Sequence, residues 1–238
     1  MPMQVVGAWQ WLKNYVPPHI QTKRGNIVKI LDIELSRPEK VGDITSYHDN
    51  PACLVTGDGR SLAEDVKEFE SWNVPHDLYC VNRSMLFFER AVKHWAAIDV
   101  EESTWFSANV NSKIEPDTNK PIHRHTIGTD SFAYDIYWKM DDKYTDMQRR
   151  VMVGSTGYFG VLTALKMGYE KIVLAGMPLD FEPHWYDPPD AEGPQWGGYT
   201  FSQWMDFQMQ HSRAPDVRSM CGYSAFILGT ATKEWLNG

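Results

Sequence analysis

Short, uninterrupted apolar runs alternate with longer helix-like segments from residue 51 onward. The clearest runs are residues 52–56, 78–81, 95–98 and 172–175. A run of four or five apolar residues is typical of a parallel strand that is covered on both faces. Strands that alternate with helices form a parallel sheet through right-handed crossovers. The sequence therefore predicts an α/β fold, with a Rossmann-like, mostly parallel sheet and helices on both faces.

The segments between these runs predict the helices. We expect helices at residues 62–72, 84–93, 158–167, 201–210 and 225–236, and a last strand at 216–220. Ser61 and Glu64 form a capping-box pattern at the start of the first helix. Gly168 stands where a helix often ends in a left-handed residue. Residues 107–130 are predicted to be a polar loop, with or without short strands, and residues 134–140 a strand or a helix.

The chain is predicted to have an extension and one domain. Residues 1–50 form the N-terminal extension, with a short helix at 5–15 and a strand at 27–35. Residues 51–238 form a single Rossmann-like nucleotide-binding domain. A chain of 238 residues is long enough for one such domain to bury a sizeable core.

The charge and composition exclude several classes of protein. The formal net charge is −8, and the densest basic groups are the pairs Lys23-Arg24 and Arg149-Arg150. Because a dedicated nucleic-acid binder needs a basic face, we expect no such role. No run of 18 apolar residues predicts a membrane span, and the N-terminus does not resemble a signal peptide. Three cysteines without a C-x-x-C pair favour a reducing compartment, so we expect the protein in the cytoplasm.

Two glycine-containing turns each lie before a predicted helix. Gly57-Asp58-Gly59 follows the strand 52–56 and is followed by Ser61, and Gly154-Ser155-Thr156-Gly157 precedes the helix 158–167. Backbone N–H groups at a helix N-terminus bind phosphate groups. The alternative is that the first is a tight turn and that Ser155 or Thr156 only caps its helix. Asn82 follows the strand 78–81, where an amide either faces a ligand crevice or caps the next helix.

Three residues are candidates for acid–base chemistry. Asp180 and His184 follow the strand 172–175, where a carboxylate and an imidazole suit proton transfer, although a loop rich in proline is also compatible with an ordinary surface. His211, at the end of the helix 201–210, is a separate candidate for a general base. His123 and His125 share a face if they lie on a strand, but no third metal ligand has a matching spacing, so we predict no metal site there.

Three segments, taken in order, resemble a known group of proteins. LVTGDGRSL followed by LYCVNRSMLFF, and then GSTGYFGVLTALKMGYEKIVLAGMPLD, resemble the signatures of the bacterial lipooligosaccharide sialyltransferase family. Archaeal hydroxymethylpterin pyrophosphokinase-like proteins and motility-associated flagellin glycosylation proteins have the same plan. Phage-encoded proteins of this size are similar as well, including at His94, Trp95 and the C-terminal segment VRSMCGYSAFILGTATKEWL.

The resemblance implies a nucleotide site and departs from the family at defined positions. It implies that the site is lined by Gly57, Asp58, Gly59, Ser61, Asn82, Ser155, Thr156 and Gly157, and that His211 takes the place of the general base. Asp58 stands where the family has Asn, and Arg60 where it has Pro. The family's paired tyrosines have no clear match here.

Two hypotheses about function follow. The first is a transferase, glycosyltransferase-like or pyrophosphokinase-like, that acts on a nucleotide or nucleotide-sugar donor, with Mg²⁺ or Mn²⁺ as a cofactor where phosphates meet Asp58. The alternative is a non-catalytic phage protein that serves as a binding or virion-assembly module, as a homo-oligomer or with virion proteins. If the chain is phage-encoded, its compartment is the host cytoplasm or the virion.

Overall fold

The computed structural model describes residues 47–90, 92–98, 123–126, 136–138, 154–193 and 198–238. The predicted helix at 5–15, the predicted strand at 27–35 and most of the polar loop 107–130 lie outside these residues. Within the described part, no helix is long and apolar enough to span a membrane.

The described residues form a seven-stranded sheet in which every neighbouring pair of strands is parallel. Its strands are β1 (Ala52–Thr56), β2 (Asp77–Val81), β3 (His94–Ala96), β4 (His123–Thr126), β5 (Ile136–Tyr137), β6 (Lys171–Ala175) and β7 (Val217–Ser219). Their order in space is β5-β4-β3-β2-β1-β6-β7. The chain thus moves outward from β1 to β5 and then returns to the other side of β1, so the strand order reverses between β1 and β6.

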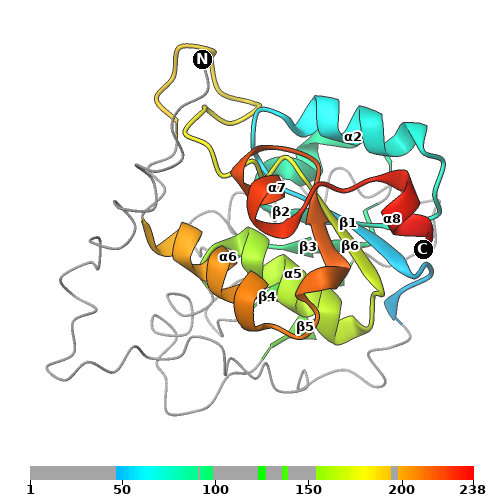
Figure 1. The fold of residues 1–238 in the computed structure, drawn as a ribbon. Coiled ribbons are helices and arrows are strands. Elements are labelled where there is room, and N and C mark those ends of the chain that lie inside the picture. The colour runs from blue at the N-terminus through cyan, green and yellow to red at the C-terminus, as the bar shows by residue number, and fades with distance from the viewer. Residues whose placement is uncertain (1–46, 91, 99–122, 127–135, 139–153, 194–197) are drawn as a thin grey trace, which may run out of the picture.

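Helices cover both faces of this sheet, as the sequence predicts (Figure 1). The helices α2 (Leu62–Ser71) and α8 (Lys233–Asn237) lie over one face, and α5 (Thr156–Met167) and α6 (Gly198–Gln210) over the other. Along β1, Cys53 and Val55 pack into the core under α5 and α6, whereas Ala52 and Leu54 pack into the core under α2 and α8. The uninterrupted apolar runs therefore reflect burial on both faces of the sheet.

The helix α5 is packed closely against the sheet. A Cβ on Gly160 would lie 3.0 Å from Val81 Cγ1 and 3.3 Å from Val55 Cγ1, so the glycine allows the helix to approach the strands. Ser155 caps the helix by accepting a hydrogen bond from the Tyr158 backbone N–H at 3.2 Å. Gly168 ends it at a φ of 96°, which confirms the predicted left-handed cap. The packing against the strands and the two caps together fix the position of the α5 N-terminus.

The segment after β2 differs from the predicted helix at 84–93. It forms a 3₁₀ helix, η3 (Asn82–Phe87), after which Phe88 is extended. The Ser84 hydroxyl accepts a hydrogen bond from the Val81 backbone N–H and can donate to the carbonyl of Thr56 or Val81, each 2.8 Å away. Ser84 thus ties this segment to the ends of β1 and β2, and this bonding competes with a regular α-helix.

Two further predictions about helices are wrong. Residues 225–236 do not form one helix: α7 (Gly222–Leu228) ends at Gly229, and α8 begins at Lys233. Between them, Ala231 N donates to Ser219 O at 2.8 Å, so this segment bonds to β7 instead of continuing the helix. The capping box at Ser61 is also absent, because the Ser61 hydroxyl donates to Asp65 Oδ2 at 2.9 Å.

Candidate functional site

A cavity of about 200 Å³ lies at the carboxyl ends of β1, β2 and β6, beside the reversal of strand order. Ligands of open α/β sheets bind at this position. The predicted site residues that line the cavity are Gly57, Asp58, Gly59, Asn82, Ser155, Thr156, Gly157, Asp180 and His184. Ser61 and His211 are not among the lining residues. The structure therefore brings together both glycine turns, the residue after β2 and the loop after β6.

The first glycine turn is closed by backbone hydrogen bonds. Gly57 N donates to Ala175 O at 2.8 Å, and Gly59 N donates to Gly176 O at 2.7 Å. A Cβ on Gly59 would lie 2.5 Å from Pro178 Cδ and 2.8 Å from Gly176 O. These two N–H groups are therefore committed to the loop after β6, and the glycines are required by its close approach. The tight-turn interpretation accounts for both glycines without a phosphate.

Asp58 braces this turn. Its Oδ2 accepts a hydrogen bond from the backbone N–H of Arg83 at 3.3 Å, and its carbonyl oxygen accepts one from Trp185 N at 3.0 Å. The residue thus joins the loop after β1 to the segment after β2 and to the loop that contains His184. A carboxylate has a structural use at this position.

Ser61 belongs to a bracing cluster outside the cavity. Cys221 Sγ lies 3.1 Å from Ser61 Oγ and 3.2 Å from Asp65 Oδ2, and the same carboxylate oxygen accepts a hydrogen bond from Gly176 N at 2.8 Å. Burial, together with the charge of Asp65, raises the pKa of the Cys221 thiol to about 12. The thiol is therefore protonated at neutral pH, and the cluster holds Gly176 in place.

The second turn offers backbone donors that are free to bind an anion. The N–H of Tyr158 is capped by Ser155, but neither Thr156 N nor Gly157 N has an acceptor among the residues that the structure describes. Both residues line the cavity. Because the positive end of the helix dipole lies here, the N-terminus of α5 is suited to a negatively charged group.

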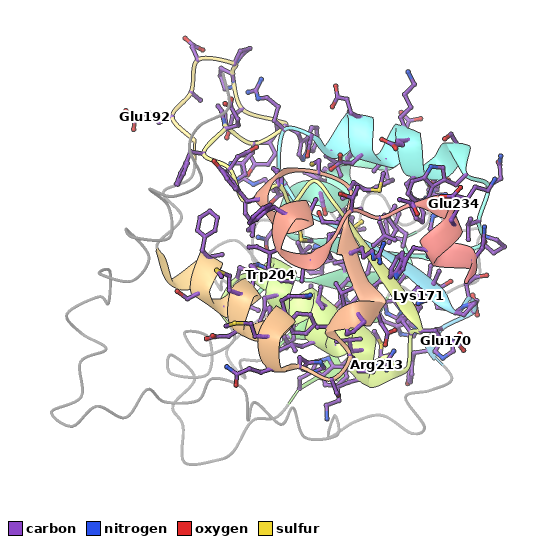
Figure 2. The ribbon with its side chains drawn as sticks, viewed as in Figure 1. Glu170, Lys171, Glu192, Trp204, Arg213 and Glu234 are labelled. Carbon is purple, nitrogen blue, oxygen red and sulfur yellow. The ribbon has the colours of Figure 1, made fainter. Side chains whose placement is uncertain are left out.

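Asn82 and Trp204, which line the cavity, also have polar atoms, Asn82 Oδ1 and Trp204 Nε1, that are buried without a hydrogen-bond partner within the described part of the chain. Asn82 adopts a positive φ of 50°, and its carbonyl accepts a hydrogen bond from Trp95 Nε1 at 3.0 Å. Trp204, labelled in Figure 2, lies on α6. Buried polar groups are usually satisfied, so an acceptor and a donor left over in one cavity indicate a polar ligand.

The loop after β6 carries a histidine paired with a carboxylate. His184 Nδ1 lies 2.9 Å from Asp187 Oδ2, and no described residue bonds to the other ring nitrogen, Nε2. Although burial opposes it, the hydrogen bonds from the His184 ring and backbone hold the pKa of the Asp187 carboxyl below its ordinary value. Burial, reinforced by the charge of Glu182, raises the pKa of Asp180. The pair resembles a general base and the group that orients it.

The structure does not bring His211 to the cavity. His211 follows α6 and precedes η4 (Ala214–Asp216), which leads into the start of β7. Its Nδ1 accepts a hydrogen bond from Arg213 N at 3.1 Å, and its ring stacks on Phe207 at 4.7 Å. Figure 2 shows Arg213 near Glu170 and Lys171, where β6 begins. His211 thus lies near the amino ends of the strands, whereas the cavity is at their carboxyl ends.

The charge of the lining is one-sided. Asp58, Asp180 and Glu182 line the cavity, and no Lys or Arg is among its described lining residues. Within the described residues, no group of three or more His, Cys, Asp and Glu side chains could hold a metal ion. The carboxylates therefore oppose a phosphate, whereas the start of α5 attracts one.

The sequence did not single out Asp187 or Trp204 as site residues. The His184-x-x-Asp187 spacing was the available signal for the pair, because a short turn brings such residues together. Trp204 gave no local signal, since only the packing of α6 places it in the lining. No family model matches the chain, and no curated protein matches it. The resemblance to the sialyltransferase group therefore stays a prediction.

Proposed function

We propose that the protein is a transferase that acts on a nucleotide-activated donor, in the manner of a glycosyltransferase. One observation carries the proposal. A single cavity beside the reversal of strand order combines uncommitted N–H groups at the start of α5 with a histidine whose ring is held by a carboxylate. The first feature suits the phosphate of a donor, and the second suits removal of a proton from an acceptor.

The roles of the residues follow from this arrangement. The N–H groups of Thr156 and Gly157 bind a donor phosphate, and Asn82 accepts a hydrogen bond from the donor. His184 Nε2 takes the proton of an acceptor hydroxyl, whose oxygen forms a bond to the donor carbon. The bond between that carbon and the phosphate oxygen breaks, and its electron pair leaves with the nucleotide. The positive end of α5 stabilises the negative charge that develops on the leaving group.

The acidic lining limits how many phosphates can bind without a cation. Unit charges about 4 Å apart interact by roughly 4 kcal/mol at an effective dielectric of 20, so phosphates near the carboxylates are repelled. Mg²⁺ and Mn²⁺ relieve such repulsion, and Mg²⁺ is usually held by one or two carboxylates together with substrate phosphates. Asp58, Asp180 or Glu182 would supply those carboxylates. We therefore expect a diphosphate donor to bind more tightly when Mn²⁺ is present.

Removing one N–H group at the start of α5 tests the phosphate site. Thr156 is the first residue of the helix, where proline is tolerated because its missing N–H has no partner within the helix. Thr156→Pro should weaken binding of nucleotides and nucleotide sugars by about tenfold or more, since a hydrogen bond to a charged group is lost. Isothermal titration calorimetry with and without Mn²⁺ measures the change.

Lys233→Pro is the matched control, because Lys233 is the first residue of α8, is exposed, and follows an extended residue as Thr156 does. It should leave the affinity unchanged. If the wild-type protein binds no nucleotide or nucleotide sugar with or without Mn²⁺, the proposed function is wrong.

The second candidate is a non-catalytic binding or virion-assembly module. It is favoured by the three carboxylates in a lining whose described residues include no Lys or Arg, and by the hydrogen bonds that the Gly57 and Gly59 N–H groups form within the protein. Absence of nucleotide binding in the same calorimetry would support it. In either case we propose action in the cytoplasm, of the host if the chain is phage-encoded, or in the virion.

A further inference from the structure

We propose that Asp187 is a positioning residue that holds the His184 ring in a single tautomer, with Nε2 free to accept a proton. The catalytic part of the proposal rests on the proposed function, because Nε2 accepts a proton only if the protein catalyses the proposed transfer. Asp187 is not among the residues that line the cavity, and it acts through His184, which does line it.

The hydrogen-bond geometry defines the tautomer. Asp187 Oδ2 lies 2.9 Å from His184 Nδ1 and 3.1 Å from the His184 backbone N. Burial opposes ionisation of this carboxyl, but the hydrogen bonds from His184 lower its pKa, so it is ionised at neutral pH. An ionised carboxylate only accepts hydrogen bonds, so Nδ1 must carry the proton. In the neutral ring, the lone pair is then on Nε2.

The segment around Asp187 is held from outside the pair. Arg60 Nη2 lies 3.3 Å from the Asp187 carbonyl oxygen and 3.2 Å from the Pro188 carbonyl oxygen. This contact fixes the backbone that carries the carboxylate. Arg60 thereby acts on the pair without approaching the imidazole.

The ring itself is supported by an aromatic neighbour. The Tyr186 ring lies nearly parallel to the imidazole, with centroids 5.2 Å apart and an interplanar angle of 12°. The Arg83 guanidinium lies 4.8 Å from the Tyr186 centroid. On the backbone, His184 forms an antiparallel bridge with Gly59, next to the glycine turn. The imidazole is thus held by its backbone, by a neighbouring ring and by one carboxylate, while none of the residues that the structure describes bonds to Nε2.

Nitrogen NMR of the protein labelled at histidine tests the proposal without any ligand. At a pH of about 8.5, two units above the ordinary histidine pKa, neutral rings report which nitrogen carries the proton. The wild type should show His184 with the proton on Nδ1. Asp187→Ala removes the acceptor, so the ring should become a mixture of the two tautomers. Asp190→Ala is the matched control, since Asp190 is an exposed aspartate of the same loop.

The outcomes separate this proposal from the proposed function. A wild-type ring protonated on Nε2, or an unchanged Nδ1 tautomer in Asp187→Ala, would overturn the positioning role. If Asp187→Ala does not fold, Asp187→Leu, which also lacks an acceptor, is used, and the wild-type spectrum alone still decides whether Nδ1 is protonated. Calorimetry measures nucleotide binding and does not depend on the tautomer of the His184 ring. If the protein binds no nucleotide, the proposed function is wrong, but the tautomer result still stands.

Discussion

Histidines lie at both ends of the sheet, and their hydrogen bonds differ. At the carboxyl end, the side chain of His184 is 29% exposed, and one of its nitrogens is bonded to Asp187 while the other is not. Toward the amino end, His94 is fully buried and bonded through both ring nitrogens, to His125 Nε2 at 3.1 Å and to the Tyr169 hydroxyl at 2.8 Å. Among the described residues, His184 therefore has one ring nitrogen without a hydrogen-bond partner, whereas both ring nitrogens of His94 have one.

The buried histidines form a hydrogen-bond chain with a fixed direction. Trp138 Nε1 can only donate, and it lies 2.9 Å from His125 Nδ1, so that nitrogen must accept. A neutral His125 then donates through Nε2 to His94 Nδ1, and His94 donates through Nε2 to Tyr169. The Tyr169 hydroxyl donates to Asp77 Oδ2 at 2.8 Å. Every link is made when both rings are neutral, and a proton added to either ring breaks one.

The comparison distinguishes a structural histidine from a candidate catalytic one. In the buried chain, the partners use each nitrogen, so the hydrogen bonds connect β2, β3 and β4 to Tyr169, two residues before β6. At the cavity, which His184 lines, Asp187 uses one ring nitrogen, and no described residue bonds to the other. Mutations should therefore affect stability strongly at the first place and weakly at the second.

The largest expected effect comes from breaking the buried chain. Tyr169→Phe removes the hydroxyl, which leaves the buried His94 Nε2–H without an acceptor and takes away one of the two hydrogen bonds to Asp77 Oδ2, the other being from Asp49 N. Buried groups left unsatisfied in this way should lower the free energy of unfolding by about 2–4 kcal/mol. Urea denaturation measures the loss. Tyr223→Phe, at an exposed tyrosine, should change it by less than about 0.5 kcal/mol, and equal losses in the two variants would contradict the chain.

The next effect is a dependence of stability on pH. Burial first, and then the charges of His125, His123 and Lys93, lower the pKa of His94 well below the ordinary value. A histidine with a lowered pKa in the folded state contributes stability above its unfolded pKa, and this is lost as the pH falls below that value. Unfolding free energy should therefore decrease below about pH 6.5, by up to roughly 1.4 kcal/mol per pH unit for this one group.

Urea denaturation between pH 7.5 and pH 5.5 checks this prediction. His211 contributes in the same direction, because burial, Arg213 and Lys166 lower its pKa, so His211→Gln serves as the control that removes this smaller share. An unfolding free energy that stays constant over this range in the wild type would show that His94 is not held neutral.

The sequence predicts the strands with continuous apolar runs because their signal is local, whereas it left the segments of β4 and β5 open. The run 52–56 is apolar at consecutive positions since both faces of β1 are covered, and the structure gives β1 the same bounds. The helix expected at 84–93 was wrong because its start is bonded to Thr56 and Val81, and Thr56 lies on a strand distant in sequence. Local propensity carries no information about such a partner.

The candidate site was predictable in position and only partly in chemistry. Residues that follow strands meet at one edge of a parallel sheet, so Asn82, Asp180 and His184 could be expected together. The hydrogen bonds of Gly57 N and Gly59 N could not be predicted, because their acceptors are the carbonyl oxygens of Ala175 and Gly176, which are distant in sequence. His94 and His125 were not linked either, since the register of β3 and β4 decides that contact.

The smallest expected effect on stability is at His184 itself. Its bond to Asp187 is partly exposed to water, and such pairs contribute little to stability, so His184→Gln should change the free energy of unfolding by less than about 1 kcal/mol. Urea denaturation beside Tyr169→Phe measures the contrast directly. Because glutamine cannot act as a base, the same variant should lose the turnover that the proposed transferase function requires and keep the nucleotide binding proposed for α5. A loss of stability as large as that of Tyr169→Phe would mean that both histidine systems are structural, and the distinction between the two ends of the sheet would fail.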